Sequence, residues 1–290
     1  MTPHSAPPHT IAIAAHPRMP DAVELTDVIA GFLKKHGLQE LHGSLYDLDL
    51  RQRVRGGEYD LLIALGGDGT MLRAGHLCAP PQIPILGINV GRFGFLTEVN
   101  HDHWEPVLER VLAGDFWLER RMTLRIEHHR ETRLLGEWDA LNECVVGRGG
   151  VVRPVRLTAE IDGRYLTTYV ADALIVATAT GSTAYALAAG GPILPPELRN
   201  ILIIPVAPHL SLDRAIVLHE GSGVRTTVHT DHQASLSVDG QTPVDLLDGD
   251  QVEACAGEHS VHFVRLQDPG YFYRNLTSRM NQNPTAGAER

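Results

Sequence analysis

The first part of the chain alternates short apolar runs with stretches in which apolar residues recur every three or four positions. Apolar runs at Thr10 to Ala15, Leu61 to Leu65 and Ile83 to Ile88 predict strands. Helical spacing follows the first run at 21–36 and recurs at Trp104 to Leu112. Strands that alternate with helices imply a parallel sheet that binds ligands at the carboxyl ends of its strands. The pattern therefore predicts a Rossmann-like α/β domain at residues 1–115.

The pattern changes after residue 115. Most of 116–267 consists of short apolar runs separated by turns, and the Asp-Gly pairs at 162–163, 239–240 and 248–249 are typical of hairpins. These features predict a second, mostly antiparallel β domain. The tail at 268–290 begins with apolar residues at helical spacing, and we expect it to return to the first domain as a helix or loop.

A glycine-rich turn follows the strand predicted at Leu61 to Leu65. It consists of Gly66, Gly67, Asp68, Gly69 and Thr70. Glycines let backbone N–H groups approach an anion, and a helix that begins near Thr70 would add the positive end of its dipole. The sequence therefore predicts phosphate binding, with a carboxylate at Asp68 that could accept a hydroxyl proton or organise a divalent cation. The structural alternative is a tight turn in which Asp68 caps the helix.

Two later segments carry candidate contacts to a nucleotide. Thr180 to Gly191 follows a predicted strand and combines hydroxyls with small residues, so that an adenine ring could lie against the backbone and stack on Tyr185. A helix start capped by Ser182 is the alternative. Asn142 and Glu143 place an amide beside a carboxylate, which suits the paired hydroxyls of a ribose or the edge of an adenine, although a turn would explain the pair equally well.

Composition narrows the class of protein. The chain has 290 residues, of which 43% are hydrophobic and 21% charged, as is usual for soluble globular proteins. No apolar run reaches the roughly 18 residues of a membrane span and no signal peptide is evident, so we expect a cytoplasmic protein with no membrane partner. The three cysteines are widely spaced, which predicts reduced thiols without a zinc site.

Charge restricts the partners further. The net charge of −10 argues against nucleic acid, which binds to basic surfaces. Lys34 and Lys35 are the only lysines, and no Walker-type G-x-x-x-x-G-K-[ST] sequence occurs. If the protein binds ATP, a divalent metal ion such as Mg²⁺, backbone amides and arginines must therefore hold the phosphates.

Taken together, the glycine-rich turn at 66–70 and the segment at 181–193 resemble the NAD kinases. The stretches 87–96, 142–143 and 239–241 fit the same family in the same order, so that the resemblance covers about residues 10 to 280. It implies ATP-dependent phosphorylation of the 2′-hydroxyl of the adenosine ribose of NAD, giving NADP and ADP. It also implies Mg²⁺ as the expected metal and a homodimer or homotetramer in which a neighbouring chain completes each dinucleotide site.

The resemblance also assigns residues. It makes Asp68 the catalytic position and Gly66, Gly67, Gly69 and Thr70 the phosphate-binding ones. The implied NAD contacts are Asp68, Gly69, Phe93, Asn142, Glu143, Arg153, Asp172, Thr183, Ala184, Tyr185, Ala188 and Gln241. A plain solvated loop is the alternative for Arg153. The chain departs from the family pattern at Ala173, Ala179 and Ala188, where glycine, proline and serine are common, which affects affinity more than activity.

Other functions remain to be weighed. A Gly-Gly-Asp-Gly turn also occurs in lipid kinases of the diacylglycerol and sphingosine type and, as a variant, in phosphofructokinases. The segment at 181–185 and the lack of a basic amphipathic segment argue against a lipid kinase. A non-catalytic dinucleotide-binding regulator is a third possibility, against which stands the intact Asp68. A hydride-transfer enzyme would need a glycine-rich fingerprint after the first strand, and 12–20 has no glycine.

Overall fold

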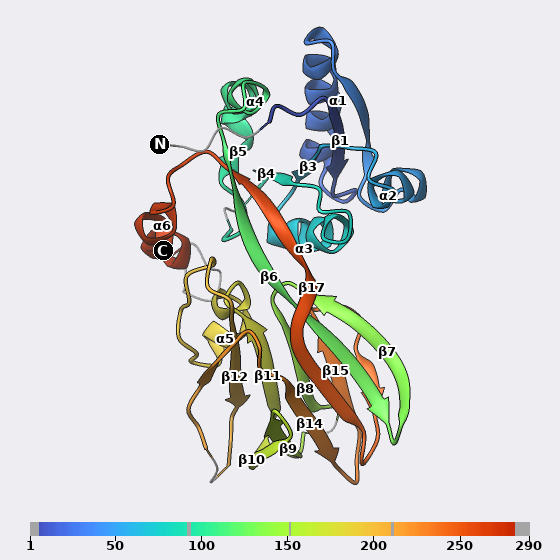
Figure 1. Cartoon of the computed structure of the whole chain (residues 1–290), viewed down its shortest axis with the longest axis vertical. Coiled ribbons are helices and arrows are strands. Elements are labelled where there is room, and N and C mark those ends of the chain that lie inside the picture. The colour runs from blue at the N-terminus through green and yellow to red at the C-terminus, as the bar shows by residue number, and fades with distance from the viewer. Residues whose placement is uncertain (1–5, 92–93, 151, 210–211, 282–290) are drawn as a thin grey trace. The chain divides into compact units, whose positions relative to one another are not determined.

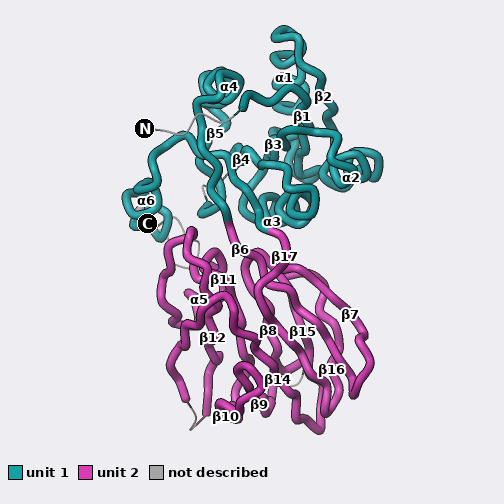
Figure 2. Tube along the Cα trace, in the orientation of Figure 1, with its two compact units in different colours: residues 1–120, 260–290 teal, residues 121–259 magenta. Residues whose placement is uncertain are grey.

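The structure, a computed structural model, describes residues 6–91, 94–150, 152–209 and 212–281. The chain divides into two compact units, residues 1–120 with 260–290 and residues 121–259 (Figure 2). We predicted boundaries at 115 and 268. The division instead falls within the long strands β6 (Trp117–Arg130) and β17 (Gln251–Arg265). A boundary inside a continuous strand has no linker composition for a sequence pattern to detect.

Unit 1 contains a parallel sheet with the strand order β2-β1-β3-β4, in which β4 also pairs with β5 and with the end of β17 at Phe263 (Figure 1 and Figure 2). Apolar residues of its strands form a core with helices α1 and α4, whereas Met71 of α3 lies against Gly87 on the alternate face. The elements are β1 (Thr10–Ala15), α1 (Pro20–Lys35), β2 (Gln39–Ser44), α2 (Leu48–Arg55), β3 (Leu61–Leu65), α3 (Asp68–Cys78), β4 (Ile85–Asn89), β5 (Val99–Asn100), η1 (His101–His103), α4 (Trp104–Leu112) and α6 (Tyr271–Asn281).

The apolar pattern predicted most of unit 1. The bounds of β1, β3 and α4 are as predicted, and the tail forms the helix α6. The prediction missed β2 and α2. Most of β2 is only half-buried at the edge of the sheet, and only two residues of α2 are buried, so neither has a continuous apolar pattern.

Unit 2 consists of two antiparallel sheets that share one apolar core. The first has the order β7-β6-β17-β14-β9-β10, and the second, called the second sheet below, has the order β13-β12-β11-β8-β15-β16. The remaining elements are β7 (Arg133–Ala140), β8 (Glu143–Arg148), β9 (Val155–Ile161), β10 (Arg164–Ala171), β11 (Ala173–Thr178), η2 (Gly181–Thr183), α5 (Tyr185–Ala188), β12 (Asn200–Val206), β13 (Ile216–His219), β14 (Val224–His229), β15 (Ala234–Val238) and β16 (Val244–Leu246).

The predicted fold class is confirmed, because a parallel α/β unit and a mostly antiparallel β unit are both present. Two of the three Asp-Gly pairs lie at hairpin turns as predicted, 162–163 between β9 and β10 and 239–240 between β15 and β16. The pair at 248–249 instead lies in the connection from β16 to β17, and these strands belong to different sheets. Asp162 and Asp239 have φ of 52° and 46°, and the glycine after each also has positive φ, which is the geometry that favours Asp-Gly. Within the described residues, no helix is long and apolar enough to cross a membrane.

Candidate active site

The glycine-rich turn joins β3 to α3. Gly66 has φ of 151°, and its N–H donates to the Ile88 carbonyl of β4 at 3.1 Å. A Cβ atom at Gly66 would lie 2.3 Å from the Thr70 hydroxyl, so no side chain fits there. The turn therefore needs glycine for two reasons, its backbone conformation and the close approach of Thr70.

Asp68 does not cap helix α3. The N-cap residue is Gly67, without a side-chain hydrogen bond, and Asp68 is the first residue of the helix. Its carboxylate instead accepts hydrogen bonds from Phe95 N–H at 2.8 Å and from Leu96 N–H at 3.0 Å. A carboxylate has about four lone-pair positions, so each oxygen keeps one for a further donor. Asp68 is thus held in place and still able to accept a proton.

A role in holding Asp68 was not predicted for the loop that binds its carboxylate. A Cβ atom at Gly94 would lie 2.1 Å from Asp68 Oδ1, so the close approach of loop and carboxylate requires glycine. The signal was present, because Gly94 belongs to the stretch that matches the NAD kinases, but the contact joins residues 27 and 28 positions apart. Phe93, which we predicted as an NAD contact, lies outside the described residues.

The residues in the N-terminal turn of α3 differ in how far they are exposed to a ligand. Gly67 and Asp68 are half-buried and Gly69 is exposed, whereas the Thr70 side chain is only 3% exposed. Thr70 N–H also donates to the Gly67 carbonyl at 2.9 Å. The N–H groups of a first helical turn lack acceptors within the helix, so Asp68 and Gly69 are better placed than Thr70 to bind a phosphate. The role of Thr70 stays a prediction.

In unit 2, Asp239 binds backbone N–H groups at one end of the second sheet. Its carboxylate accepts three backbone hydrogen bonds, from the N–H groups of Leu141 at 2.7 Å, Asn142 at 2.9 Å and Glu143 at 3.0 Å. Asp239 N–H donates in return to the Glu143 carbonyl at 3.0 Å. The Asp-Gly turn after β15 therefore fixes the Asn142–Glu143 pair at the start of β8. This is a supporting role that sequence reasoning missed.

Strand β11 ends beside the same pair. Thr178 N–H donates to the Asn142 carbonyl at 2.8 Å, and the Thr178 hydroxyl accepts from Gly181 N–H at 3.1 Å. A Cβ atom at Gly181 would lie 2.2 Å from the Asn142 carbonyl oxygen. Within the described residues, the Asn142 side chain makes no hydrogen bond and is half-buried, so its amide is available to a ligand.

Ser182 is not a helix cap. Its hydroxyl donates to the Ala179 carbonyl at 2.6 Å and accepts from Leu194 N–H at 2.9 Å, and the N-cap residue of α5 is Ala184. The predicted contacts in this segment lie nearer the surface: Thr183 and Ala184 are half-buried, whereas Tyr185 and Ala188 are exposed. Gln241, also exposed, lies in the turn after β15.

Glu143 carries an unusual carboxyl group. Its side chain is buried, and Oε2 has no hydrogen-bond partner within the described residues. Burial, followed by the negative charge of Asp239, raises the pKa of Glu143 to about 8, against a smaller lowering by a hydrogen bond from Tyr185 N–H. Glu143 therefore carries a proton at neutral pH and can donate a hydrogen bond that an ionised glutamate cannot.

This raised pKa predicts how stability depends on pH. The folded protein keeps the Glu143 proton up to about pH 8, whereas the unfolded chain loses it near 4.5, so the free energy of unfolding falls as pH rises through this window. Glu143→Gln lacks this titration, so its stability relative to wild type should increase from pH 5 to pH 8 by on the order of 3 kcal/mol. Urea denaturation at four pH values measures the difference. The exposed Glu197→Gln is the control, and a pH-independent difference at Glu143 would contradict the prediction.

Asp172 and Arg153 lie at the opposite end of the second sheet. The register pairs Ala173 with Gly147 near the end of β8, whereas Ala177 pairs with Glu143 at its start, so Asp172 is roughly 15–20 Å from Glu143 along the strands. Asp172 accepts a hydrogen bond from Arg148 Nε at 3.1 Å, and Arg153 is exposed. The predicted NAD contacts of unit 2 thus form two groups on one chain.

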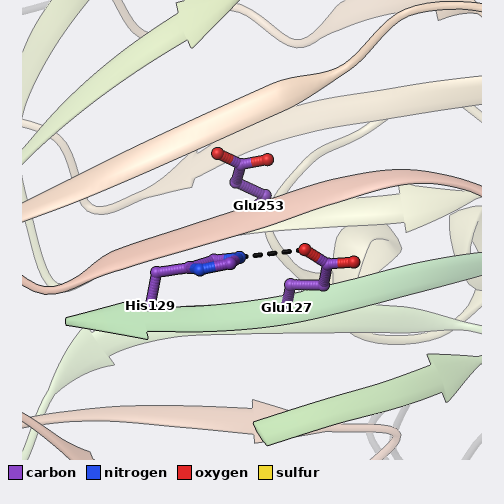
Figure 3. A group of neighbouring side chains, drawn as sticks. All are labelled: Glu127, His129 and Glu253. Carbon is purple, nitrogen blue, oxygen red and sulfur yellow. Dashed lines mark hydrogen bonds and ion pairs between the residues drawn. The ribbon is translucent and has the colours of Figure 1, made fainter. Parts of the chain in front are cut away.

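Glu127, His129 and Glu253 form the most metal-like group that the described residues contain (Figure 3). They lie on β6 and β17, and none was predicted as a site residue. His129 Nε2 is 2.9 Å from Glu127 Oε2. Both carboxylates also have guanidinium partners, Arg125 at 2.8 Å for Glu127 and Arg225 at 2.8 Å for Glu253. The group therefore has the character of a surface ion-pair network, and we assign it no metal.

Comparison with known proteins identifies related sequences along most of the chain. Residues 49–116 match the model of the ATP-NAD kinase N-terminal domain, and residues 141–266 match that of the C-terminal domain. An NAD kinase of Chloroflexus aggregans is 38% identical over 274 residues, which cover 94% of this chain and 99% of that protein. An NAD kinase of Dehalococcoides mccartyi is 36% identical over 275 residues, with 94% and 96% coverage.

Solved structures resemble this fold as well. Yeast NADH kinase complexed with NADH has a TM-score of 0.84 at 24% identity, covering 98% of this chain and 90% of that one, which supports the fold alone. An NAD kinase from Archaeoglobus fulgidus in complex with ATP has a TM-score of 0.75 at 26% identity, covering 94% of this chain and 99% of that one.

Proposed function

This chain belongs to the ATP-NAD kinase family and catalyses the ATP-dependent phosphorylation of NAD, and we propose that Asp68 is the proton acceptor of that reaction. The observation that carries this proposal is the geometry of Asp68. It lies at the amino end of α3 with glycine on both sides of it in the chain, and both of its carboxylate oxygens accept hydrogen bonds from backbone N–H groups.

The reaction joins the 2′-oxygen of the adenosine ribose to the γ-phosphorus of ATP and breaks the bond to the bridging oxygen, so that NADP and ADP result. The hydroxyl proton passes to a lone pair of Asp68 that the loop does not use. Phosphoryl transfer gains mainly from positioning and from cancellation of charge. In this chain the N–H groups of Asp68 and Gly69 and the dipole of α3 are suited to both tasks.

Mg²⁺ fits this turn. The ion usually keeps several waters and binds through substrate phosphates together with one or two carboxylates, and the turn offers one carboxylate, that of Asp68. Bound with ATP, the ion would neutralise phosphate charge. The chain has only two lysines, and both lie on α1. Besides the metal ion, positive charge near the phosphates would therefore come mainly from arginine.

Unit 2 supplies the proposed contacts to the dinucleotide. The Asn142 amide and the protonated Glu143 suit the hydroxyls of a ribose, and the exposed Tyr185 ring suits stacking on adenine, with Thr183, Ala184, Ala188 and Gln241 at the same end of the sheet. Asp172 and Arg153 belong to the other end. Two groups so far apart on one chain are consistent with a homo-oligomer whose dinucleotide site takes one group from each of two chains, which we propose for this protein.

The direct test of the activity is NADP formation by the purified protein with NAD, ATP and Mg²⁺, followed through an NADP-specific coupled dehydrogenase. We expect NADP to form only when all three are present. Phosphorylation of diacylglycerol or sphingosine instead would favour the lipid-kinase alternative, and NAD binding without NADP would favour a regulator. Neither alternative is favoured by the relatives described above. A cytoplasmic location stays a prediction.

The dinucleotide assignment predicts which kinetic constant changes. Asn142→Ala and Tyr185→Ala should each raise the KM for NAD about tenfold, the equivalent of ~1.4 kcal/mol of lost contact, with little change in the KM for ATP. Steady-state kinetics with each substrate varied measures both constants. Tyr165→Ala, which removes a 66% exposed tyrosine of β10, is the control. A change confined to the KM for ATP would show that these residues bind the other substrate.

A further inference from the structure

The loop that holds Asp68 is itself held by two buried arginines. Arg279 of α6 donates from Nη1 to the Phe95 carbonyl and from Nη2 to the Thr97 carbonyl, both at 3.0 Å. Arg265, the last residue of β17, donates from Nη1 to the Leu96 carbonyl at 3.0 Å. Three consecutive carbonyls of the loop therefore accept hydrogen bonds from guanidinium groups. The loop and both arginines belong to unit 1.

One of these contacts connects directly to Asp68 through a single peptide group. The carbonyl of Phe95 and the N–H of Leu96 belong to the same peptide unit. Arg279 binds its carbonyl end, and Asp68 Oδ1 accepts from its N–H end at 3.0 Å. Hydrogen bonds in such a chain polarise one another. The charge of Arg279 therefore strengthens the hydrogen bond that orients the Asp68 carboxylate.

Burial makes this arrangement rigid. Arg265 and Arg279 are only 1% and 3% exposed, so their charges act where water screens them little. Arg265 forms an ion pair with Glu119 at 2.7 Å, and the Tyr271 hydroxyl donates to the same carboxylate at 2.7 Å. The Tyr271 ring lies 5.2 Å from the Arg265 guanidinium carbon and 5.5 Å from that of Arg279. Both guanidinium groups are thus fixed on several sides.

A purely structural role for Arg279 would be to attach α6. The helix has other attachments, because Tyr271 and Phe272 are 1% and 5% exposed in the unit 1 core. Anchoring a helix also does not require a buried charge, which is costly to desolvate. The two loop carbonyls explain the charge better than helix attachment does.

We propose that Arg279 is a positioning residue for phosphoryl transfer. Acting through the peptide group of Phe95 and Leu96, it holds the Asp68 carboxylate in the orientation that accepts the proton of the 2′-hydroxyl. Arg265 and Glu119 support the same loop from β17 and β6. The proposal rests on the assignment of Asp68 as proton acceptor and names a second residue on which that role depends.

The test is a double-mutant cycle on the full-length protein. Arg279→Met should lower kcat about 10- to 100-fold, the usual effect of a misplaced catalytic group, and leave the KM for NAD and ATP within about twofold. In the Asp68→Asn background the same change should lower kcat by less than about twofold, because no carboxylate remains to be positioned. Arg274→Met is the control, since Arg274 lies on the same helix, is exposed and pairs with Asp268 at 2.6 Å; its kcat should stay at the wild-type value.

Two further outcomes separate the explanations. Equal losses of kcat in both backgrounds would overturn the proposal, because Arg279 would then act independently of Asp68. Wild-type turnover in Asp68→Asn alone would overturn the proton-acceptor assignment and this proposal with it. Arg279→Lys keeps the charge and can reach one carbonyl, so it should recover part of the lost kcat; if Arg279→Met does not fold, the cycle is run with Arg279→Lys and judged by the same criterion.

Discussion

Asp68→Asn should lower the turnover of NAD phosphorylation by about 10² to 10⁴, the usual effect of removing a positioned acid or base. The amide cannot take the proton of the 2′-hydroxyl. It also cannot accept both hydrogen bonds that Phe95 and Leu96 donate, because one of its two groups is itself a donor. The KM for NAD should change little, since the proposed dinucleotide contacts of unit 2 are untouched. Initial rates with purified variant and wild type measure the effect.

A matched control separates catalysis from stability at this position. Asp47 is also an acid at the start of a unit 1 helix, where its carboxylate accepts from Leu50 N–H at 3.1 Å as the N-cap of α2. Asparagine caps helices as well as aspartate does, so Asp47→Asn should keep both turnover and melting temperature. Asp68→Asn with full turnover would exclude Asp68 as the base. Lost turnover together with a collapsed melting temperature would require the assay to be repeated at lower temperature.

Asp239→Asn should have the largest effect on unit 2. The carboxylate of Asp239 accepts the N–H groups of Leu141, Asn142 and Glu143, and an amide leaves one of them facing a donor. Stability should fall by about 1–3 kcal/mol, the cost of an unsatisfied buried group, and the KM for NAD should rise because Asn142 and Glu143 lose their fixed position. Chemical denaturation and steady-state kinetics measure the two effects.

The Asp-Gly turn between β9 and β10 supplies the control. Asp162 also has positive φ, and its carboxylate accepts one exposed hydrogen bond, from Gly223 N–H at 2.8 Å. Asparagine tolerates positive φ at both positions, so backbone strain is the same in the two variants. Asp162→Asn should therefore cost less than about 0.5 kcal/mol and leave the KM for NAD unchanged. Equal losses at the two turns would show that Asp239 does not organise the Asn142–Glu143 pair.

Several features of the site were accessible only in part from the sequence. The glycine-rich turn indicated where Asp68 would lie, because a short apolar strand followed by glycines is a local pattern. The N-cap alternative for Asp68 was also consistent with that pattern. The structure excludes it, because Gly67 is the N-cap residue and the Asp68 carboxylate accepts from the loop at 94–97. Asn142 and Asp239 were noticed as separate motifs, but their contact joins positions 97 residues apart, which no local spacing reveals.

The sequence by itself determined the alternation of strands and helices in most of unit 1, the mostly antiparallel β character of unit 2, two of the Asp-Gly hairpins and the class of chemistry, since each depends on residues that are neighbours along the chain. The tertiary structure alone decided that Asp68 is held by loop amides, that Arg279 holds that loop from α6, and that Asp172 lies at the opposite end of the second sheet from Glu143. The physical reason is that burial and hydrogen bonding depend on which distant segments pack together, and this contact information is not contained in the local pattern of apolar and polar residues.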